Sequence, residues 1–480
     1  MDEERDLIEQ GPIYVENDKD ERPSPSDIHL VGRDTCGKCL RPLQFESMTT
    51  IPNVIFDSES TLRIEQRVSK SDQQCGRQLH VFGRLDICSS GESSNRGRIE
   101  IKITSGDKKL TAATNIHFDD HFVDIRTPFL ADWWDKIGPK PCVKLLITVY
   151  IPCDGQIGTL ELKVDSLDVS VIEGVRLKVA DKMSITTFSG HVRVPLLSRI
   201  GRASGIRLDS REMLLQTYSG AIEGGFSLHD LLKIKSGSGS VVVELGLVSG
   251  DPASATSAKL SVETDFGNIR ITTPFIFFYR QSKKGYKNIP PSRDYVVELE
   301  TTSGKIEADV VVASRATIRS RAGDVLLRLV PVPFSARTNG KTTLVTDVDY
   351  GKTRVFLLES SHNGAPYTGN ASLTTDLQAT NTSSNGLVGL HSAHRSISGD
   401  IKVDVPDAWS GEFIADTHTG DITAYGKNIT IMRSSQGEPR MMEGLRGSRD
   451  SSVRMKSLWG SLELFVGLPQ VLARGKTTRT

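Results

Sequence analysis

The chain lacks several features that would place it in a common functional class. Its 59 Lys and Arg are matched by 59 Asp and Glu, so the formal net charge is zero, which argues against a general nucleic-acid binder. No apolar run approaches the ~18 residues of a transmembrane helix. The acidic start, residues 1–6, does not resemble a secretory signal either. The sequence therefore predicts neither nucleic-acid binding nor a membrane-spanning segment in this chain.

Cysteine is confined to the first third of the chain, and residues 154–480 contain none. We therefore expect the larger part to fold without disulfides. The six cysteines are Cys36, Cys39, Cys75, Cys88, Cys142 and Cys153. The close pair Cys36 and Cys39 is compatible with a zinc or a redox site. No second Cys/His pair accompanies it, as a zinc site would require, and no βαβ pattern, as thioredoxin-like redox chemistry would require. Incidental or locally paired thiols are the favoured interpretation.

Catalytic motifs are also missing. The sequence has no nucleophile elbow, phosphate loop, dinucleotide fingerprint or zincin helix. His391 and His394 lie close together, but no carboxylate motif stands beside them. We therefore expect no catalytic residue, no cofactor and no metal ion.

The chain does contain a repeat. Each copy has a Ser/Thr-rich approach, a Gly, a polar residue and then a β-branched or aliphatic residue that opens an apolar alternation. Thr301–Ile306 and Arg319–Val325 are adjacent copies. The repeated turn glycines are Gly190, Gly220, Gly239, Gly267, Gly304, Gly323, Gly399, Gly420 and Gly460. Successive separations are 30, 19, 28, 37, 19, 76, 21 and 40 residues, several of them near one or two multiples of ~20.

The residue types of this repeat indicate a β-solenoid. Gly permits a corner with φ > 0, and Ser or Thr before it can stack hydroxyl on hydroxyl between coils. Alternate Val, Ile and Leu after it point inward. Each coil then adds one strand per face, and roughly fourteen coils spaced ~4.8 Å apart would form a rod about 65 Å long. The fold class predicted is all-β.

We divide the chain by these patterns into four parts. Residues 1–50 are an acidic, Pro/Ser-rich disordered arm, with ten Asp/Glu against three Lys/Arg in 1–27. Residues 51–154 form a β-sandwich-like cap, residues 155–466 the solenoid, and residues 467–480 a basic tail. From about residue 52 to 180, alternating segments predict strands at 79–87, 99–103, 143–151 and 160–171. Trp133 and Trp134 there are expected to plug the end of the β-core, although stacking on a sugar ring is the alternative.

Two loops interrupt the solenoid, at 274–291 and 362–386. The first is an aromatic cluster with a basic, Pro-closed end, expected to fold over the solenoid wall or to act as a contact arm. The second is Asn-, Thr- and Gly-rich. It contains the possible N-glycosylation sites Asn370 and Asn381, and Asn428 is a third.

Asp324, Asp400 and Asp421 follow equivalent turn glycines and are expected to align along the rod. Aligned carboxylates can bind Ca²⁺ or act as acid and base in β-helix polysaccharide-degrading enzymes. Repeated capping of the turns is the favoured interpretation.

The repeat phrases resemble those of a known family. They are TTSGKIEADV at 301–310, SISGDIKVDV at 396–405 and THTGDITAYG at 417–426. These look like the Ser-Gly-Asp-Ile repeats of the putative-adhesin, domain-of-unknown-function β-solenoid proteins. The order of features over 75–466 resembles the fungal branch: a Pro-Cys stretch at Lys140–Pro152, the repeats, the phrase Ile289–Tyr295 and a closing corner at Trp459–Leu462. The resemblance implies a right-handed single-stranded β-helix with a cell-surface or adhesive role.

The function expected is therefore non-catalytic: adhesion or display at the cell surface, with a glycan or a cell-surface protein as partner. Two alternatives stay open, a β-helix polysaccharide-degrading enzyme and an intracellular structural scaffold. The resemblance implies an extracellular or cell-surface location, whereas the lack of a signal or membrane segment favours the cytoplasm.

Overall fold

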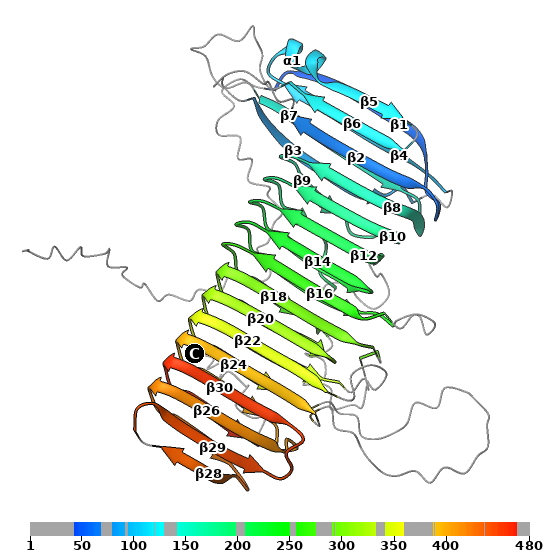
Figure 1. The fold of residues 1–480 in the computed structure, drawn as a ribbon. Coiled ribbons are helices and arrows are strands. Elements are labelled where there is room, and N and C mark those ends of the chain that lie inside the picture. The colour runs from blue at the N-terminus through cyan, green and yellow to red at the C-terminus, as the bar shows by residue number, and fades with distance from the viewer. Residues whose placement is uncertain are drawn as a thin grey trace, which may run out of the picture.

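A computed structural model of the protein is almost entirely β-strand (Figure 1). It describes residues 43–68, 79–91, 95–119, 121–128, 142–197, 207–249, 256–274, 290–291, 293–332, 341–359, 387, 389–435 and 437–467. In these residues the one α-helix is α1 (Lys108–Ala113), and no helix is long and apolar enough to cross a membrane. The all-β class expected from the sequence is confirmed.

The strands form two large sheets, A and B. In spatial order sheet A contains β1 (Phe45–Ile55), β4 (Arg96–Ser105), β7 (Cys142–Ile151), β3 (His80–Ser89), β9 (Asp168–Val171), β11 (Val192–Arg193), β13 (Ile222–Leu228), β15 (Val241–Leu247), β17 (Ile269–Thr272), β19 (Ile306–Val312), β21 (Val325–Pro331), β23 (Thr353–Leu357), β25 (Ile401–Val405), β31 (Leu462–Val466) and β27 (Ile422–Gly426). Sheet B contains β28 (Thr430–Ser435), β29 (Arg440–Arg446), β26 (Gly411–Thr419), β30 (Ser452–Trp459), β24 (Leu390–Ser398), β22 (Thr342–Tyr350), β20 (Arg315–Ala322), β18 (Tyr295–Ser303), β16 (Ala258–Thr264), β14 (Leu231–Ser236), β12 (Arg207–Thr217), β10 (Arg176–Thr187), β8 (Gly155–Val164), β2 (Thr61–Val68), β6 (Phe122–Thr127) and β5 (Asn115–Asp119).

From β8 to β25 the chain alternates between the sheets. A strand in sheet B is followed by a corner and a strand in sheet A, and we call each such pair a rung. Neighbouring rungs pair in parallel: Thr301 of β18 is opposite Ser320 of β20, and Ile306 of β19 is opposite Val325 of β21. Alternate residues point between the sheets, so one continuous hydrophobic core runs the length of the stack.

The first strands extend the same two sheets. β2 pairs in parallel with β8, and β3 pairs in parallel with β9. Antiparallel pairs then end this side of the stack: β1 with β4 and β4 with β7 in sheet A, and β5 with β6 in sheet B. Residues 45–50, within the stretch that the sequence places in the arm, begin β1. The segment 160–171, expected as one strand, is divided between β8 and β9 by a corner.

The last rungs do not follow the order of the chain. β30 pairs with β24 on one side and with β26 on the other, and β31 lies between β25 and β27. In Figure 1 the red β30 lies between β24 and the orange β26. The last copy of the repeat, Gly460–Val466, therefore does not cover the end of the stack, although its place in the chain order would predict that it does. β26 to β29 form that end, because the β26 and β30 repeats fit the same register.

Several sequence-based predictions fall outside the described residues. These are the Cys36–Cys39 pair, residues Trp133 and Trp134, the sequons Asn370 and Asn381, the tail 468–480 and nearly all of the loops 274–291 and 362–386.

Candidate functional site: an exposed corner row

A column of glycines forms the corner that leads from sheet B to sheet A. A Cβ placed on Gly323 would lie 2.1 Å from the carbonyl oxygen of Gly304, and one on Gly220 would lie 1.8 Å from that of Gly190. Each glycine in the column approaches the backbone of the preceding rung in this way. In spatial order the column is Gly190, Gly220, Gly239, Gly267, Gly304, Gly323, Gly351, Gly399, Gly460 and Gly420. All nine repeat glycines lie in it, together with Gly351.

Two different constraints act on these corners. Gly304, Gly323, Gly399 and Gly420 have φ between +118° and +154°, where a side chain is strained. The other repeat glycines have no such φ. At those positions the close approach of the next backbone is what excludes a Cβ.

A buried hydroxyl three residues before the glycine fastens many of the corners. The Thr217 Oγ1 accepts a hydrogen bond from the Gly220 N–H at 2.9 Å and donates one to the Gly190 carbonyl at 3.2 Å. Thr187 makes the equivalent contacts with Gly190 and Leu167. Since these hydroxyls link one rung to the next inside the core, the Ser/Thr part of the repeat is structural.

At several corners the residue after the glycine caps the following corner. Asp324 Oδ1 accepts a hydrogen bond from the Lys352 N–H at 2.8 Å, and Asp400 Oδ1 accepts one from the Ser461 N–H at 3.1 Å. Asp421 is bonded to Arg440. Lys352 occupies the rung between Asp324 and Asp400, so these carboxylates are not adjacent. In the described part of the chain no group of three or more His, Cys, Asp or Glu could hold a metal ion.

The two neighbouring histidines do not share a site. His391 Nδ1 bonds Ser452 Oγ at 3.0 Å on the outer face, whereas His394 lies in the core and its Nδ1 bonds Thr346 Oγ1 at 2.9 Å. Residues three apart in a strand point to opposite faces. Burial lowers the pKa of His394 to about 4, so it is neutral at physiological pH.

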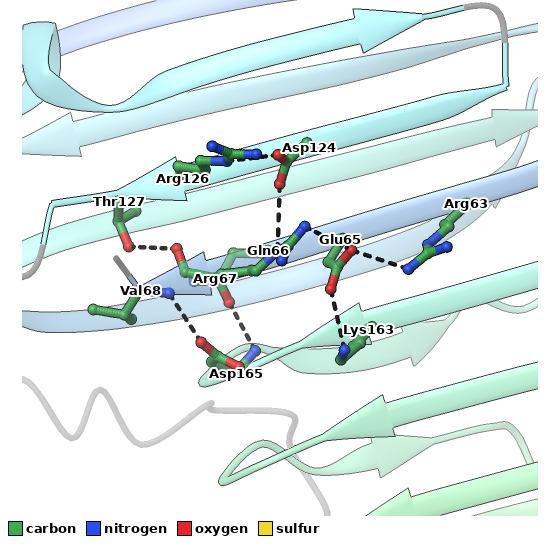
Figure 2. Close-up of polar contacts among 10 residues, drawn as sticks. All are labelled: Arg63, Glu65, Gln66, Arg67, Val68, Asp124, Arg126, Thr127, Lys163 and Asp165. Carbon is green, nitrogen blue, oxygen red and sulfur yellow. Dashed lines mark hydrogen bonds and ion pairs between the residues drawn. The ribbon is translucent and has the colours of Figure 1, made fainter. Parts of the chain in front are cut away.

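A cluster of buried charges on sheet B is also structural (Figure 2). The Glu65 side chain is only 2% exposed and forms ion pairs with Arg63, Arg67 and Lys163 at 3.1–3.2 Å. Asp124 is held by Arg126 at 2.7 Å. The cluster joins strands β2, β6 and β8, and each of the two buried carboxylates is matched by cations.

In the same cluster, Gln66 Oε1 accepts a hydrogen bond from the Asp165 N–H, and Asp165 Oδ2 accepts one from the Val68 N–H. These bonds fix the corner after β8 against the end of β2 (Figure 2). Because most of the polar groups in this cluster bond within the protein, these residues are poor candidates for a binding site.

Exposed large apolar side chains, all but one of them aromatic, lie along the outside of the glycine column. Each is one or two residues before a column glycine, where the chain turns and both positions face outward. We call these residues the corner row: Phe188, Tyr218, Phe266, Tyr350, Leu458 and Trp459. Their exposed fractions are 42–66%, and the rings of Phe188 and Tyr218 stack 4.8 Å apart at 3°. Large apolar side chains exposed in a line are a feature of interaction surfaces.

Small hydroxyl side chains fill most of the same positions in the other rungs. The position directly before the glycine column can be followed through five successive rungs of sheet B, where each residue is opposite the next: Ser303, Ala322, Tyr350, Ser398 and Trp459. The corner row is therefore a narrow strip of rings separated by small, mostly uncharged residues. Sequence reasoning missed it, although the position of an aromatic residue just before a turn glycine was a usable signal.

Asn428 is exposed in the turn between β27 and β28, with φ of 59°. Its side chain is accessible to modification in this position. It is the one possible glycosylation site within the described residues.

Comparisons with known proteins give only distant likenesses. No family model matches the chain, and no curated protein matches it. A putative adhesin from Parabacteroides distasonis is 10% identical, with 88% of this chain and 97% of that chain covered and a TM-score of 0.25. A putative adhesin from Bacteroides fragilis is 10% identical over 88% and 99%, with a TM-score of 0.23. A putative cell adhesion protein from Clostridium sporogenes is 7% identical over 88% and 99%, with a TM-score of 0.14. Similarity at this level assigns neither family nor function.

Proposed function

We propose that the protein is a non-catalytic, adhesin-like β-solenoid that binds an extended polysaccharide through the corner row. The solenoid spans 155–466, and the region 51–154 covers its first coil as a cap. The observation that carries the proposal is the line of exposed rings Phe188, Tyr218, Phe266, Tyr350 and Trp459 along one corner of a rigid stack.

The chemistry of this strip suits a sugar polymer. The C–H faces of a pyranose ring are apolar and stack on an aromatic face, while its hydroxyls bond small polar side chains such as Ser303 and Ser398. From Phe188 to Trp459 the row crosses eight rung spacings, about 38 Å at ~4.8 Å per strand. A binding line of this length favours a long chain with many weak contacts over a compact ligand.

The positions of the carboxylates favour binding over hydrolysis. Glycoside hydrolysis needs two carboxyl groups on either side of one bond, in an open groove. Asp324 and Asp400 instead accept hydrogen bonds from backbone N–H groups of the next rung. Removing either group would loosen a corner, so the polysaccharide-degrading alternative has weaker support.

The test is co-sedimentation of the purified protein with insoluble β-glucan, chitin and cellulose. The row variant carries Phe188→Ala, Tyr218→Ala, Phe266→Ala, Tyr350→Ala and Trp459→Ala. Because these side chains are exposed, the variant is expected to fold and to lose binding.

The matched control replaces two exposed aromatic residues that lie away from the row, Phe118→Ala and Tyr425→Ala, which are 40% and 53% exposed. The control is expected to bind as the parent does. Equal binding by the row variant and the parent, or no binding of the parent to any of these polymers, contradicts the proposal.

A further inference from the structure

The rung formed by β30 and β31 occupies an interval between two parts of the chain that both precede it in sequence. β24 and β25 lie on one side, and β26 and β27 on the other (Figure 1). After β25 the chain leaves one rung position empty and forms the following rung with β26 and β27. It then forms the hairpin β28–β29 and returns, and β30 and β31 fill the empty position.

Both edges of this interval accept the same strands in equivalent registers. Ser452 of β30 is opposite His391 of β24 on one side and opposite Glu412 of β26 on the other. Leu462 of β31 is likewise between Ile401 and Ile422. The interval is a preformed site for a pair of strands, with backbone hydrogen bonds along both edges.

The part beyond the interval holds itself together. We call residues 406–446 the end module. In it β26 pairs antiparallel with β29, and Arg446 Nη2 contacts Asp407 Oδ1 at 2.6 Å. Arg446 Nη1 also donates to the Trp409 carbonyl at 3.0 Å. The β26, β29 and β28 part of the module therefore holds together without the inserted rung, whereas β27 pairs with β31.

The inserted rung is joined to the end module by residues 447–451. Residues 447–450 of this connection are exposed. Ser448 bonds Ser410 in the end module, and Ser451 Oγ donates to the Leu387 carbonyl. Between these two anchors lie Arg449 and Asp450, a short polar stretch suited to act as a hinge.

We propose that residues 452–466 are exchanged between two copies of this chain, so that the rung of each copy fills the interval of the other. Each contact of the rung, including Lys402–Glu463 and Lys456–Asp416, is made equally well within a chain or between chains. Only the hinge differs, which is the condition under which domain swapping is favourable.

The order of folding supplies the open state that exchange requires. Segments nearer the N-terminus fold first during synthesis, so β24–β25 and the end module can form before residues 452–466. Two unpaired strand edges then face each other across the interval. Unpaired edges recruit strands, and at high protein concentration the strand pair comes from a second copy.

The experiment uses two variants of the full chain, Arg395→Cys and Lys456→Cys, each of which adds one cysteine to the six native ones. These positions are opposite each other across β24 and β30 and are both exposed. The spacing of adjacent strands allows a disulfide between them. The variants are unfolded together in urea, refolded at high concentration and oxidised with glutathione disulfide. Peptide mass spectrometry then measures the yield of dimer whose disulfide joins position 395 of one copy to position 456 of the other, which distinguishes it from linkage through the native cysteines.

The matched control mixes Asp347→Cys with Arg395→Cys. These residues lie in the same column, across β22 and β24, where the rungs follow the chain order. We expect about ten-fold more mixed disulfide-linked dimer from the first pair than from the control pair. A double variant, Arg395→Cys with Lys456→Cys in one chain, verifies that the pair can close. Closure within that double variant, with equal dimer yields from the two mixed pairs, overturns the proposal.

Discussion

Substitution of single column glycines by alanine measures what holds the rungs together. In Gly323→Ala the new Cβ would be 2.1 Å from the Gly304 carbonyl oxygen, and the residue would keep φ near +143°. The strained φ costs roughly 1–3 kcal/mol. To relieve the contact the two rungs must separate, which weakens the bonds Gly304 N–H to Ala322 O and Ile306 N–H to Asp324 O. At about 1 kcal/mol for each bond, we expect a total loss of roughly 3–5 kcal/mol in the free energy of unfolding.

Two further glycines separate the contributions. In Gly220→Ala the new Cβ would lie 1.8 Å from a backbone oxygen, but the residue has no left-handed φ. Only the steric contact therefore lowers the free energy of unfolding. Gly174→Ala has φ of +90° but no atom within 4 Å of the new Cβ, so only the strain acts. We expect a loss of about 2 kcal/mol or more for Gly220→Ala and about 1 kcal/mol for Gly174→Ala.

Urea unfolding followed by circular dichroism gives the three midpoints, and hydrogen exchange locates the weakened rungs. Because stability in a stacked repeat is a sum over neighbours, the loss should be concentrated near the substituted corner. If Gly220→Ala is as stable as the parent, the close approach of the rungs is not what requires glycine, and the reasoning fails.

Three other changes have defined outcomes. Thr217→Val removes the hydroxyl that bonds Gly220 and Gly190 and should cost about 2 kcal/mol in urea unfolding, whereas Thr217→Ser, which keeps the hydroxyl, should cost less than half of that. Because burial lowers the pKa of His394 from 6.5 to about 4, the unfolded state binds the proton more readily. The contribution of His394 to the free energy of unfolding is therefore fully present above pH ~6.5, and about 3 kcal/mol of it is lost as the pH falls toward 4. His394→Gln should lack this part of the pH dependence of stability. Expression in a eukaryotic secretory host should add a glycan at the exposed Asn428, detected by mass spectrometry and absent in Asn428→Gln; an unmodified Asn428 in such material would contradict its accessibility.

The sequence predicted the strand content well because the repeat combines independent signals at each corner. Gly, a hydroxyl before it and an aliphatic residue after it each have a structural reason, visible at Thr217, Gly220 and Ile222. Gly351 was missed because Val348 takes the place of the hydroxyl residue in its rung. The close approach that requires glycine there depends on the neighbouring rung, which one copy of a repeat does not reveal.

The order of the last rungs could not be read from the repeat either. The copies that end at Gly420 and Gly460 have the same pattern, so either fits beside Gly399. Only the connections and the hairpin β28–β29 decide between them. The corner row was missed for a related reason: aromatic residues in strands are usually buried, and Tyr295 is buried whereas Tyr350 is exposed. Their distance from the turn glycine distinguishes the two.

The central claim is that the corner row binds a polysaccharide along its length. Calorimetric titration with a series of soluble oligosaccharides of increasing length, cut from the polymer that co-sediments with the protein, tests it most directly. Affinity should rise with chain length until the oligosaccharide spans about 38 Å, the length of the row. Removal of one ring, as in Phe266→Ala, should weaken binding of the longest oligosaccharide about five-fold, equivalent to about 1 kcal/mol. An affinity that is independent of length, or unchanged in Phe266→Ala and in the five-residue row variant, would contradict the claim.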